Sequence, residues 1–347
     1  MKALFLAGGK GIRMHPLTDK VPKPMVPIIN KPLLERTMVH LKKNGISEIV
    51  ISSCYRSQDI EEYFGNGEQF GLKIKYIVED IPLGTGGAIK KAGARFKDTF
   101  MVFNSDIICD LDIQKMIDFH TRSRALATIA VTEVQDPSAY GVIEYDRDGY
   151  AVSFIEKPKP EQISSNFINA GIYIFEPELL KEIPINQVVS VEREVFPELL
   201  AKGHKIAVYK DDSYWMDIGT IEKYIQVHKD IMNRKCRMID CNFSISNISL
   251  GKNVRIHPDS RIIGPVCVGD NVEICAKAII SNSVIGNNVI IGSGSRVVGS
   301  ILWNDTIIGS GVGLKNTIVT SNCFIDGGLN FLSTVYSRSI DLQKVPV

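Results

Sequence analysis

A short unit that begins with an aliphatic residue and glycine recurs after Met232. The first three copies begin at residues 250, 268 and 285, which are 18 and 17 residues apart, close to three six-residue steps. A six-residue period is typical of a hexapeptide β-helix, in which each step gives one short strand and one turn. Three steps complete one triangular coil, with aliphatic side chains inside and glycine or asparagine at the turns. The four copies are Leu250-Gly251-Lys252-Asn253-Val254, Val268-Gly269-Asp270-Asn271-Val272, Ile285-Gly286-Asn287-Asn288-Val289 and Ile308-Gly309-Ser310-Gly311-Val312.

The repeats predict a left-handed parallel β-helix at residues 248–347, after a linker at 233–247. The fourth copy begins 23 residues after the third, which predicts an irregular coil before Ile308. The segment after Asp326 is expected to form a terminal cap. A single coil cannot bury its aliphatic residues, and a stack of coils leaves open strand edges at its ends. We therefore expect a homo-oligomer that assembles through the β-helix.

Residues 1–232 follow a different pattern, in which short apolar strands alternate with amphipathic helices. A chain of 347 residues exceeds the size at which one hydrophobic core stops growing, so a second domain is expected. The alternation is typical of an α/β fold with a mixed, mostly parallel, Rossmann-like sheet. Helical spacing through Leu34, Met38 and Leu41 predicts a helix at residues 31–44. Strands are predicted at residues 3–7, 49–52, 74–78, 99–103, 128–134 and 171–175.

Charge and cysteine content narrow the class of protein. The net charge is +1 and there is no dense Lys/Arg block, which argues against nucleic acid or an anionic membrane as a partner. The seven cysteines are odd in number and scattered, which favours a reducing compartment. Because no two of them form a CxxC pair, they are interpreted as small buried hydrophobic residues and not as zinc ligands. No run reaches the roughly 18 unbroken apolar residues of a membrane helix. The sequence therefore predicts a cytoplasmic protein.

The strongest local signal is the glycine-rich run Leu6-Ala7-Gly8-Gly9-Lys10-Gly11-Ile12-Arg13, at the end of the first predicted strand. Glycines let backbone N–H groups approach an oxyanion, and the arginine adds a forked cation. The run lacks the GKS or GKT of a Walker A loop, and a tight structural turn would also explain its glycines. Further on, Pro22 and Pro24 flank Lys23, which predicts a rigidly held lysine that binds a second phosphate. The alternative is a solvated lysine.

Together these segments resemble the leading signature of the sugar nucleotidyltransferases, LAGGxGTRLxPLTxxxPKPM, and the resemblance extends along almost the whole chain. It implies that Arg13 and Lys23 are catalytic, because they would neutralise charge on phosphorus and hold the leaving pyrophosphate. Ile12 stands where the family has threonine, so a hydroxyl contact with phosphate is lost, and the effect of this change is left open. The nucleotide-binding residues that the resemblance implies in this loop are Leu6, Ala7, Gly8, Gly9 and Gly11.

Two aspartates match motifs of the same family, and the first of them, Asp106, follows a predicted strand. Asp106 ends the segment Phe103-Asn104-Ser105-Asp106, which also resembles the mannose-specific branch, and Asp217 lies in Trp215-Met216-Asp217-Ile218-Gly219. A single aspartate at a strand end is often only a helix N-cap. Two carboxylates that share one Mg²⁺ with phosphate oxygens, however, are suitable ligands for a hard cation. We therefore predict that Asp106 and Asp217 are catalytic and bind a Mg²⁺ cofactor.

The sugar side of the resemblance covers Tyr140-Gly141, Glu156-Lys157-Pro158 and Asn169-Ala170-Gly171. Glu156 can accept hydrogen bonds from sugar hydroxyls, Lys157 can meet the sugar phosphate, and Asn169 can donate and accept. Taken singly, Glu156 and Lys157 are also compatible with an ordinary surface pair. The sugar-phosphate-binding residues that the resemblance implies are Tyr140, Gly141, Glu156, Lys157, Asn169 and Gly171.

The nucleobase is expected over Leu83-Gly84-Thr85-Gly86-Gly87, where missing side chains let a flat ring approach the backbone. Gly84 and Thr85 are accordingly expected to bind the nucleotide. By spacing, Glu79 corresponds to a base-reading position at which thymidylyl relatives have an amide. A carboxylate accepts both donors of guanine, whereas uracil and thymine present two carbonyl groups that would repel it. Glu79 therefore predicts GTP, and the alternative is an exposed acid beside Asp80.

The segments at residues 190–197 and 214–217 are similar to those of mannose-1-phosphate guanylyltransferases. The predicted reaction is Mg²⁺-assisted in-line transfer of GMP from GTP to mannose 1-phosphate, which gives GDP-mannose and pyrophosphate. Alternatives are a glucose-1-phosphate uridylyl- or thymidylyltransferase and a non-catalytic regulator that binds nucleotide sugars. A hexapeptide acyltransferase is disfavoured, because the one histidine of the repeat, His257, stands in a turn-like context. The exact sugar and base, the oligomeric state and any allosteric effector stay open.

Overall fold

The structure is a computed structural model, and by its internal contacts the chain divides into two units. It describes residues 1–93, 95–239 and 241–337. Unit 1 consists of Met1–Lys10, Pro22–Pro24 and Leu33–Asp217. Unit 2 consists of Gly11–Val21, Met25–Pro32 and the chain from Ile218 onward. The loop that carries Arg13 and the segment after Lys23 therefore pack with the C-terminal part of the chain, a grouping that the sequence pattern does not indicate.

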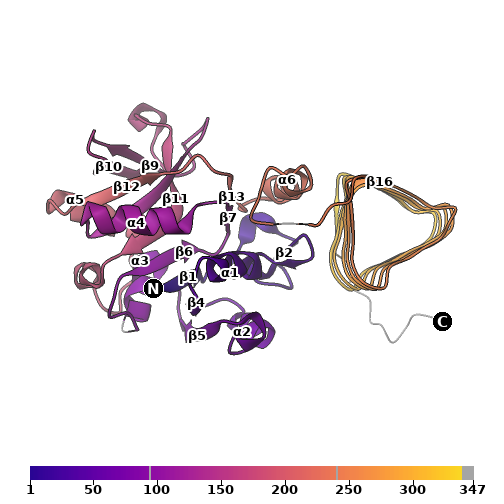
Figure 1. Cartoon of the computed structure of the whole chain (residues 1–347), viewed down its shortest axis with the longest axis horizontal. Helices are drawn as coiled ribbons and strands as arrows, with labels where there is room; N and C mark the ends of the chain where they lie inside the picture. The colour runs from indigo at the N-terminus through magenta and orange to yellow at the C-terminus, as the bar shows by residue number, and fades with distance from the viewer. Residues whose placement is uncertain (94, 240, 338–347) are drawn as a thin grey trace. The chain divides into compact units, whose positions relative to one another are not determined.

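A mixed nine-stranded sheet forms the centre of unit 1 (Figure 1). Its path is β10-β9-β11-β6-β1-β4-β5, and β8 pairs with β11 and with β12. β1 lies between β6 and β4 and is parallel to both, whereas β11 is antiparallel to β6. Leu4 and Phe5 of β1 are fully buried, as expected for a central strand that is covered on both faces. The strands are β1 (Lys2–Ala7), β4 (Glu48–Ser53), β5 (Lys73–Val78), β6 (Phe100–Asn104), β8 (Ala127–Glu133), β9 (Gly141–Tyr145), β10 (Ala151–Glu156), β11 (Phe167–Phe175) and β12 (Ile206–Lys210).

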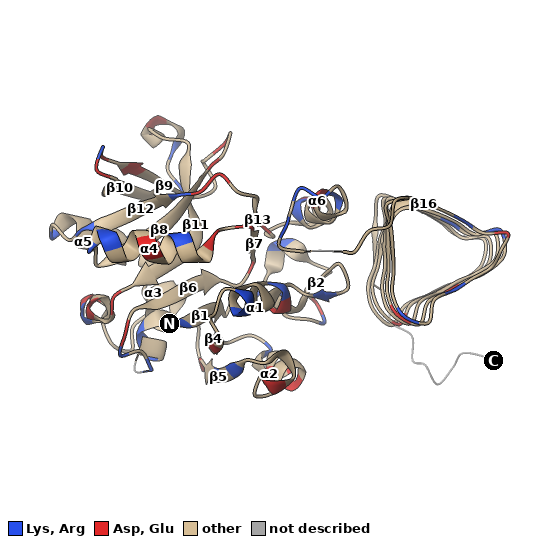
Figure 2. Cartoon of the chain, viewed as in Figure 1, with Lys and Arg blue, Asp and Glu red and all other residues tan. Residues whose placement is uncertain are grey.

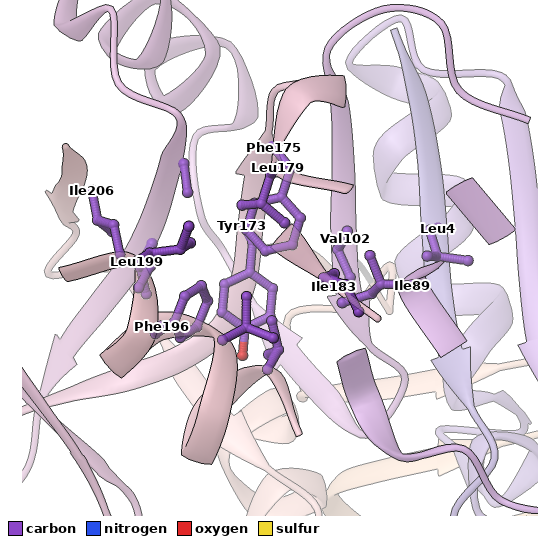
Figure 3. Close-up of a cluster of buried hydrophobic side chains, with 14 of the residues drawn as sticks. Leu4, Ile89, Val102, Tyr173, Phe175, Leu179, Ile183, Phe196, Leu199 and Ile206 are labelled. Carbon is purple, nitrogen blue, oxygen red and sulfur yellow. The ribbon is translucent and has the colours of Figure 1, made fainter. Parts of the chain in front are cut away.

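Helices bury apolar side chains against this sheet. Ile89 of α3 and Phe196 of α5 belong to one core cluster with Leu4 and Tyr173 (Figure 3). Burial of side chains of this size stabilises the fold by about 1.5 to 3 kcal/mol each. Asp112 begins α4 as its N-cap, because its carboxylate accepts a hydrogen bond from Lys115 N at 3.1 Å. The helices of this unit are α1 (Leu33–Lys43), α2 (Ser57–Phe64), α3 (Gly84–Gly93), α4 (Ile113–Ser123) and α5 (Phe196–Ala201).

Two element boundaries differ from those that the sequence predicts. The helix expected from residue 31 begins at Leu33, because Lys31–Pro32 forms β3 and pairs with β2 (Pro27–Ile28). The strand expected from residue 171 begins at Phe167. Gly171 in its middle has φ 70°, and the register of β11 against β8 shifts between Asn169 and Tyr173. This bulge interrupts the apolar pattern on which the prediction depended.

Unit 2 is built around a parallel β-helix, whose coils are stacked along the view in Figure 1. The inward side chains of successive coils form continuous buried columns, such as Ile274, Ile291 and Ile308. The strands are β14 (Ile248–Leu250), β15 (Arg255–Ile256), β16 (Arg261–Val268), β17 (Glu273–Ile274), β18 (Ile279–Ile285), β19 (Ile290–Ile291), β20 (Arg296–Val298), β21 (Ile301–Leu302), β22 (Ile307–Ile308), β23 (Gly313–Lys315), β24 (Ile318–Val319), β25 (Phe324–Ile325), β26 (Asn330–Leu332) and β27 (Val335–Tyr336).

The coil before Ile308 is regular, so the irregular coil that the 23-residue interval predicts is wrong. Ile285 pairs with Leu302, and Ile291 pairs with Ile308, so this coil advances by 17 residues. The position that follows Ile285-Gly286 is therefore Leu302-Trp303, where tryptophan replaces the glycine by which the repeat is recognised. Ile308-Gly309 instead continues the column of Ile291-Gly292. The repeat was assigned to the wrong column because one glycine of its template is missing.

The expected terminal cap is also different in its described part. β26 and β27 pair in parallel with β23 and β24, so residues 330–336 add one more coil to the stack. The rest of the predicted cap, residues 338–347, lies outside the described residues. Turn residues of successive coils form side-chain ladders, in which Asn253, Asn271, Asn288 and Asp305 are joined by hydrogen bonds of 2.8 to 3.0 Å. Their φ values of 56° to 58° are in the left-handed region that asparagine and aspartate tolerate.

One face of the β-helix is buried on its outer as well as its inner side. The outward side chains of Cys267, Val284, Ile301 and Ile318 are at most 5% exposed. Helix α6 (Ile221–Met232) contacts β16 and has its own buried face with Tyr224 and His228. Thr220 begins this helix as its N-cap. The β-helix is therefore packed at β16 against α6 of the same unit.

Among the described residues, no helix is long and apolar enough to cross a membrane. Lys and Arg residues alternate with Asp and Glu residues along the ribbon of both units (Figure 2).

Candidate active site

A short antiparallel ribbon brings the two predicted metal ligands together. β7 (Ile107–Cys109) follows Asp106 directly, and β13 (Trp215–Asp217) ends with the second aspartate. In their register Asp217 lies opposite Ile107, one residue from Asp106. Asp106 does not cap a helix, because the chain continues into β7, so the structural alternative for this residue is wrong. Asp106 and Asp217 are far apart in the sequence, and the ribbon makes them neighbours at the carboxyl end of β6.

Lys23 is held against this carboxylate pair. Its ammonium group forms an ion pair with the carboxylate of Asp106, and its side chain is only 12% exposed. The lysine begins a 3-10 turn, Lys23–Met25, and the prolines on either side of the lysine restrict the backbone. The alternative of a solvated lysine is therefore wrong. Asp217 has a separate partner, since Tyr140 donates its hydroxyl to Asp217 Oδ1 at 2.8 Å.

The glycine-rich run leaves β1 at Ala7, and its next residues lie beside open space. Apart from its chain neighbours, no heavy atom of the described residues lies within 4 Å of a Cβ placed at Gly9. A Cβ at Gly8 would lie 3.8 Å from Glu79 Oε1. Ser105 ties this edge of the sheet together, because its Oγ donates to the carbonyl of Leu6 at 2.7 Å. Internal packing explains Gly8 only weakly and does not explain Gly9.

The continuation of the run, Gly11–Val21, belongs to unit 2, and a hydrogen bond joins its first residue to a residue near its end. Thr18 Oγ1 donates to the carbonyl of Gly11 at 2.9 Å, and Gly11 has φ 67°. Met14 is fully buried, whereas Arg13 is exposed on the short 3-10 turn Ile12–Met14. The side chain of Ile12, which replaces the family's threonine, is 70% exposed. The substitution therefore places an apolar side chain in solvent and fills no part of the core.

Glu79 is not the exposed acid of the alternative interpretation, because it is only 5% exposed. Its Oε1 accepts a hydrogen bond from Ser52 Oγ at 2.8 Å, and its Oε2 accepts one from Leu83 N at 2.9 Å. It therefore anchors the loop at residues 79–83 as well as lying beside Gly8. Each carboxylate oxygen accepts more than one hydrogen bond, so acceptor capacity is left over.

The glycines of the predicted base-binding turn lie against another segment of unit 1. A Cβ at Gly84 would lie 2.5 Å from the carbonyl oxygen of Val189, and one at Gly87 would lie 2.6 Å from that of Gln187. Gly86 N donates to the Val189 carbonyl at 2.8 Å. The missing side chains thus admit the chain's own segment at residues 187–189. Packing within unit 1 therefore already explains these glycines, and binding of the base over this turn stays a prediction.

Glu192 is a residue of this site that the sequence interpretation did not single out. Its Oε2 accepts hydrogen bonds from Thr85 Oγ1 at 2.6 Å and from Ser190 Oγ at 2.8 Å. Thr85 Oγ1 in turn accepts a hydrogen bond from Val191 N at 2.9 Å. Glu192 lies in a π-helical turn, Val191–Val195, a conformation frequent at functional sites. The available signal was the family-like segment at 190–197, to which no residue role was attached.

The predicted sugar-binding residues are connected to Glu192 through Tyr173. Asn169 Nδ2 donates to the Tyr173 hydroxyl at 2.8 Å, and that hydroxyl donates to Glu192 Oε1 at 3.5 Å. Asn169 Oδ1 accepts from Gly171 N at 2.9 Å. Burial, followed by the nearby charge of Glu192, raises the pKa of the Glu156 carboxyl above its ordinary value. The turn at Thr85 and the predicted sugar residues thus share one polar cluster.

Neighbouring side chains lie so close to the backbone of Gly141 and Gly171 that a side chain at either position would clash with them. A Cβ at Gly141 would lie 2.9 Å from Glu156 Oε2, and one at Gly171 would lie 2.7 Å from Asn104 Nδ2. Asn104 Oδ1 is buried and has no hydrogen-bond partner among the described residues. A buried, unsatisfied acceptor is costly, so this oxygen is suited to receive a donor from a ligand. Asn104 was noted in the sequence only for its family likeness.

The aromatic residues of the sugar side fix the ribbon that ends with Asp217. Trp215 Nε1 donates to the carbonyl of Ala170 at 3.0 Å, and the rings of Trp215 and Tyr140 meet edge to face at 5.8 Å. Lys157 N donates to the carbonyl of Tyr140 at 2.9 Å, while the lysine side chain is exposed. Of the predicted sugar residues, Tyr140 thus contacts the carboxylate pair directly, and Lys157 is connected to it through Tyr140.

Comparisons with known proteins identify the families that the two parts of the chain match. Residues 2–234 match the family of nucleotidyl transferases, and residues 262–331 match the GlmU-like C-terminal hexapeptide family. The mannose-1-phosphate guanylyltransferase of Mycobacterium tuberculosis is 37% identical over 274 residues, which cover 78% of this chain and 76% of that protein. The UTP–glucose-1-phosphate uridylyltransferase of Synechocystis sp. is 34% identical over 319 residues, 82% of each chain.

A solved structure is similar as well. The crystal structure of HddC from Yersinia pseudotuberculosis complexed with GMP-PN has a TM-score of 0.58 and 31% sequence identity to this chain. The match covers 66% of this chain and 99% of that one. The family match over residues 2–234 includes the glycine-rich run, Lys23 and both aspartates. The chain therefore belongs to the nucleotidyl transferase family.

Proposed function

We propose that this chain is a Mg²⁺-dependent sugar-1-phosphate nucleotidyltransferase that uses GTP and mannose 1-phosphate. The observation that carries the proposal is the juxtaposition of Asp106, Asp217 and Lys23 at one strand end. An oxygen of the sugar phosphate attacks the α-phosphorus of the triphosphate. The bond from that phosphorus to the bridging oxygen breaks, and pyrophosphate leaves with the electron pair. The products are GDP-mannose and pyrophosphate.

The two carboxylates fit a hard divalent cation. Asp106 and Asp217 offer only oxygen ligands from neighbouring strands, which leaves further positions for phosphate oxygens and water. Mg²⁺ bound there would supply positive charge to the triphosphate. Lys23 forms an ion pair with Asp106, so its ammonium group lies at the same strand end and would contribute positive charge to a bound phosphate. Arg13 supplies a second cation for the leaving pyrophosphate.

Two kinds of support favour GTP and mannose 1-phosphate. Glu79 presents a buried carboxylate beside Gly8, which matches the two donors of guanine. Glu156, Asn169 and Asn104 offer acceptors and donors for sugar hydroxyls. Several relatives carry the name mannose-1-phosphate guanylyltransferase, and one carries the name of a glucose-1-phosphate uridylyltransferase. The choice of sugar and base therefore needs a direct test.

The test is a turnover panel. The purified chain is incubated with Mg²⁺, pyrophosphatase, one of five nucleoside triphosphates and one of several sugar 1-phosphates, and nucleotide sugar is separated by chromatography. We expect GDP-mannose from GTP and mannose 1-phosphate, and no product when EDTA replaces Mg²⁺. Product from UTP or dTTP with glucose 1-phosphate would instead establish the alternative specificity. Absence of product from every pair would favour the non-catalytic regulator.

The base assignment is tested by Glu79→Gln. The amide keeps one acceptor but turns a donor toward a donor of guanine, which costs about 1 to 3 kcal/mol, a roughly five- to hundredfold loss in kcat/KM for GTP. The ratio of kcat/KM for GTP to that for UTP should fall. Ser52→Ala is the matched control, because it removes one partner of Glu79 and leaves the carboxylate in place. An unchanged ratio in Glu79→Gln would show that this residue only anchors its loop.

Self-association through the β-helix and a cytoplasmic location stay predictions. Light scattering of the intact chain checks the first, since a monomeric mass would contradict it.

A further inference from the structure

Trp303 breaks the pattern of the coil in which it lies. Gly286 precedes it by one coil at the same position, and a Cβ at Gly286 would lie 2.5 Å from the Trp303 carbonyl carbon. Trp303 therefore takes the place of a repeat glycine. Its large side chain is only 5% exposed. A tryptophan that replaces a recurring glycine and is buried on a packed face has a partner outside the repeat.

That partner is Tyr224 of α6. Trp303 Nε1 donates to the Tyr224 hydroxyl at 2.9 Å, and this hydroxyl donates to the carbonyl of Pro27 at 2.9 Å. Tyr224 is fully buried, and burial raises the pKa of its phenol well above the ordinary value. The hydroxyl thus keeps its proton and continues to donate at physiological pH. The β-helix is thereby linked by two hydrogen bonds to the segment that follows Lys23.

Further bonds hold the same segment. His228 Nε2 accepts from Ile29 N at 3.3 Å, while its Nδ1 donates to the carbonyl of Tyr224 at 2.8 Å. Asn30 Nδ2 donates to the carbonyl of Ile285, in the β-helix, at 2.7 Å. Ile29 and Asn30 have φ values of 46° and 65°. A β-branched residue in the left-handed region is strained, and such a conformation persists only where its surroundings impose it.

The loop that carries Arg13 adjoins the other side of Trp303. Together with Pro16, Leu17, Lys20 and Val21, the indole lines a cavity of about 190 Å³. One side chain of the β-helix is thus adjacent to the loop at residues 11–21 and bonded through Tyr224 to residues 27–30. These two segments precede and follow Lys23 in the chain. Both belong to unit 2.

We propose that Trp303 and Tyr224 are positioning residues for Arg13, the phosphate-binding cation of unit 2. They fix the conformation of the segments at residues 11–21 and 25–30 and thereby the direction from which Arg13 meets the phosphates. The β-helix then contributes to turnover in addition to any assembly role. This inference rests on the proposed function, because it assigns the two residues to the transfer step.

The first test compares Tyr224→Phe and Trp303→Phe with Ile308→Val. Tyr224→Phe deletes a single oxygen, and Trp303→Phe removes the indole donor. Ile308→Val trims the buried column of the β-helix away from both segments. A small misplacement of a catalytic group lowers kcat steeply, so we expect about a tenfold loss of kcat in both aromatic variants, with KM for the sugar phosphate nearly unchanged. Ile308→Val should keep the wild-type kcat even if its unfolding temperature falls equally.

A double-mutant cycle distinguishes positioning from general loosening. If Tyr224 acts through the Arg13 loop, its substitution should change kcat little once Arg13→Ala has removed the guanidinium. Losses that multiply fully in the double variant would overturn the proposal. Wild-type kcat in Tyr224→Phe would overturn it as well, as would an equal loss in Ile308→Val.

Hydrogen exchange gives a readout that requires no substrate. In Tyr224→Phe, amides of residues 11–30 should exchange several-fold faster than in the wild type, while the β-helix amides at residues 290–308 keep their protection. Unchanged exchange in residues 11–30 would contradict the positioning role even if the enzyme is active. If the wild type turns over no substrate pair, the proposed function fails, and hydrogen exchange still decides whether these two residues hold the segments.

Discussion

Glycine has opposite surroundings in the loop after β1 and in the β-helix. A Cβ at Gly269 would lie 2.7 Å from the Gly286 carbonyl carbon of the next coil, whereas a Cβ at Gly9 would have no close neighbour among the described residues. In the β-helix, the stacking distance of the coils requires the missing side chain. In the loop, folding imposes no such requirement. A glycine that packing does not explain marks space that a ligand can use.

The comparison also separates two glycine clusters within the predicted nucleotide site. Gly84 resembles the β-helix glycines, because the chain's own carbonyl at Val189 fills the space beside it. Gly9 does not. Chemistry should therefore be sensitive to changes near Gly9 and the carboxylate pair, whereas changes in the coils should affect stability first. Four predictions test this contrast.

The largest effect is expected from Asp217→Asn. It removes one of the two carboxylates that would hold Mg²⁺. We expect kcat to fall about a hundredfold or more, because the positive charge that would stabilise the phosphates is held less well. Glu273→Gln is the matched change in the β-helix, where the exposed carboxylate pairs with Arg255 at 2.8 Å. It should leave kcat unchanged. Steady-state kinetics at saturating Mg²⁺ checks both, and wild-type turnover in Asp217→Asn would remove the metal assignment.

Gly9→Ala and Gly269→Ala should give opposite outcomes. A methyl group at Gly9 meets open space, so stability should hold while KM for the nucleotide rises about tenfold, the value of one obstructed contact of about 1.4 kcal/mol. A methyl group at Gly269 meets the next coil and should destabilise the β-helix by about 1 to 3 kcal/mol. Thermal unfolding and nucleotide titration measure the pair. Reduced stability of Gly9→Ala with normal KM would mean that the open space has no ligand role.

Glu192→Gln should change the pH dependence of sugar-phosphate binding. Burial and the charge of Glu192 raise the pKa of Glu156, so Glu156 takes up a proton at a higher pH than an isolated glutamate. KM for the sugar phosphate should rise as the pH falls through this raised value, because the carboxylate acceptor is lost. Neutral glutamine removes part of the cause, so the rise in KM should move to lower pH. An unmoved acid limb would separate Glu192 from the sugar site.

The smallest effect is expected from Asn288→Gly. Glycine accepts the φ of 56° at this turn, so the variant loses mainly the ladder bonds to Asn271 and Asp305. The unfolding free energy of the β-helix should fall by about 1 kcal/mol. Asn186→Gly, at φ 55° in unit 1, is the control and should not change the unfolding of the β-helix. Calorimetry of the intact chain resolves the two cases, and turnover should be normal in both.

Local patterns predicted those parts of the site that depend on strand ends and on short motifs. Asp106 could be selected because it follows an apolar strand, Asp217 because its segment resembles a family motif, and Lys23 because two prolines flank it. The roles of Glu192 and Trp303 depend on partners 107 and 79 residues away along the chain, to which no periodic pattern points. The contact of Gly84 with Val189 could not be predicted for the same reason, since Val189 is distant in sequence.

The fixed partner of Trp303 restricts how the number of repeats can vary among descendants of this chain. Insertion of one 17-residue coil before Trp303 would move the indole along the stack by about 4.8 Å, the spacing of neighbouring strands, and separate it from Tyr224. An extra coil added after β27 would leave that contact unchanged. Duplications and deletions of whole repeats should therefore be tolerated at the far end of the array and eliminated by selection at the near end.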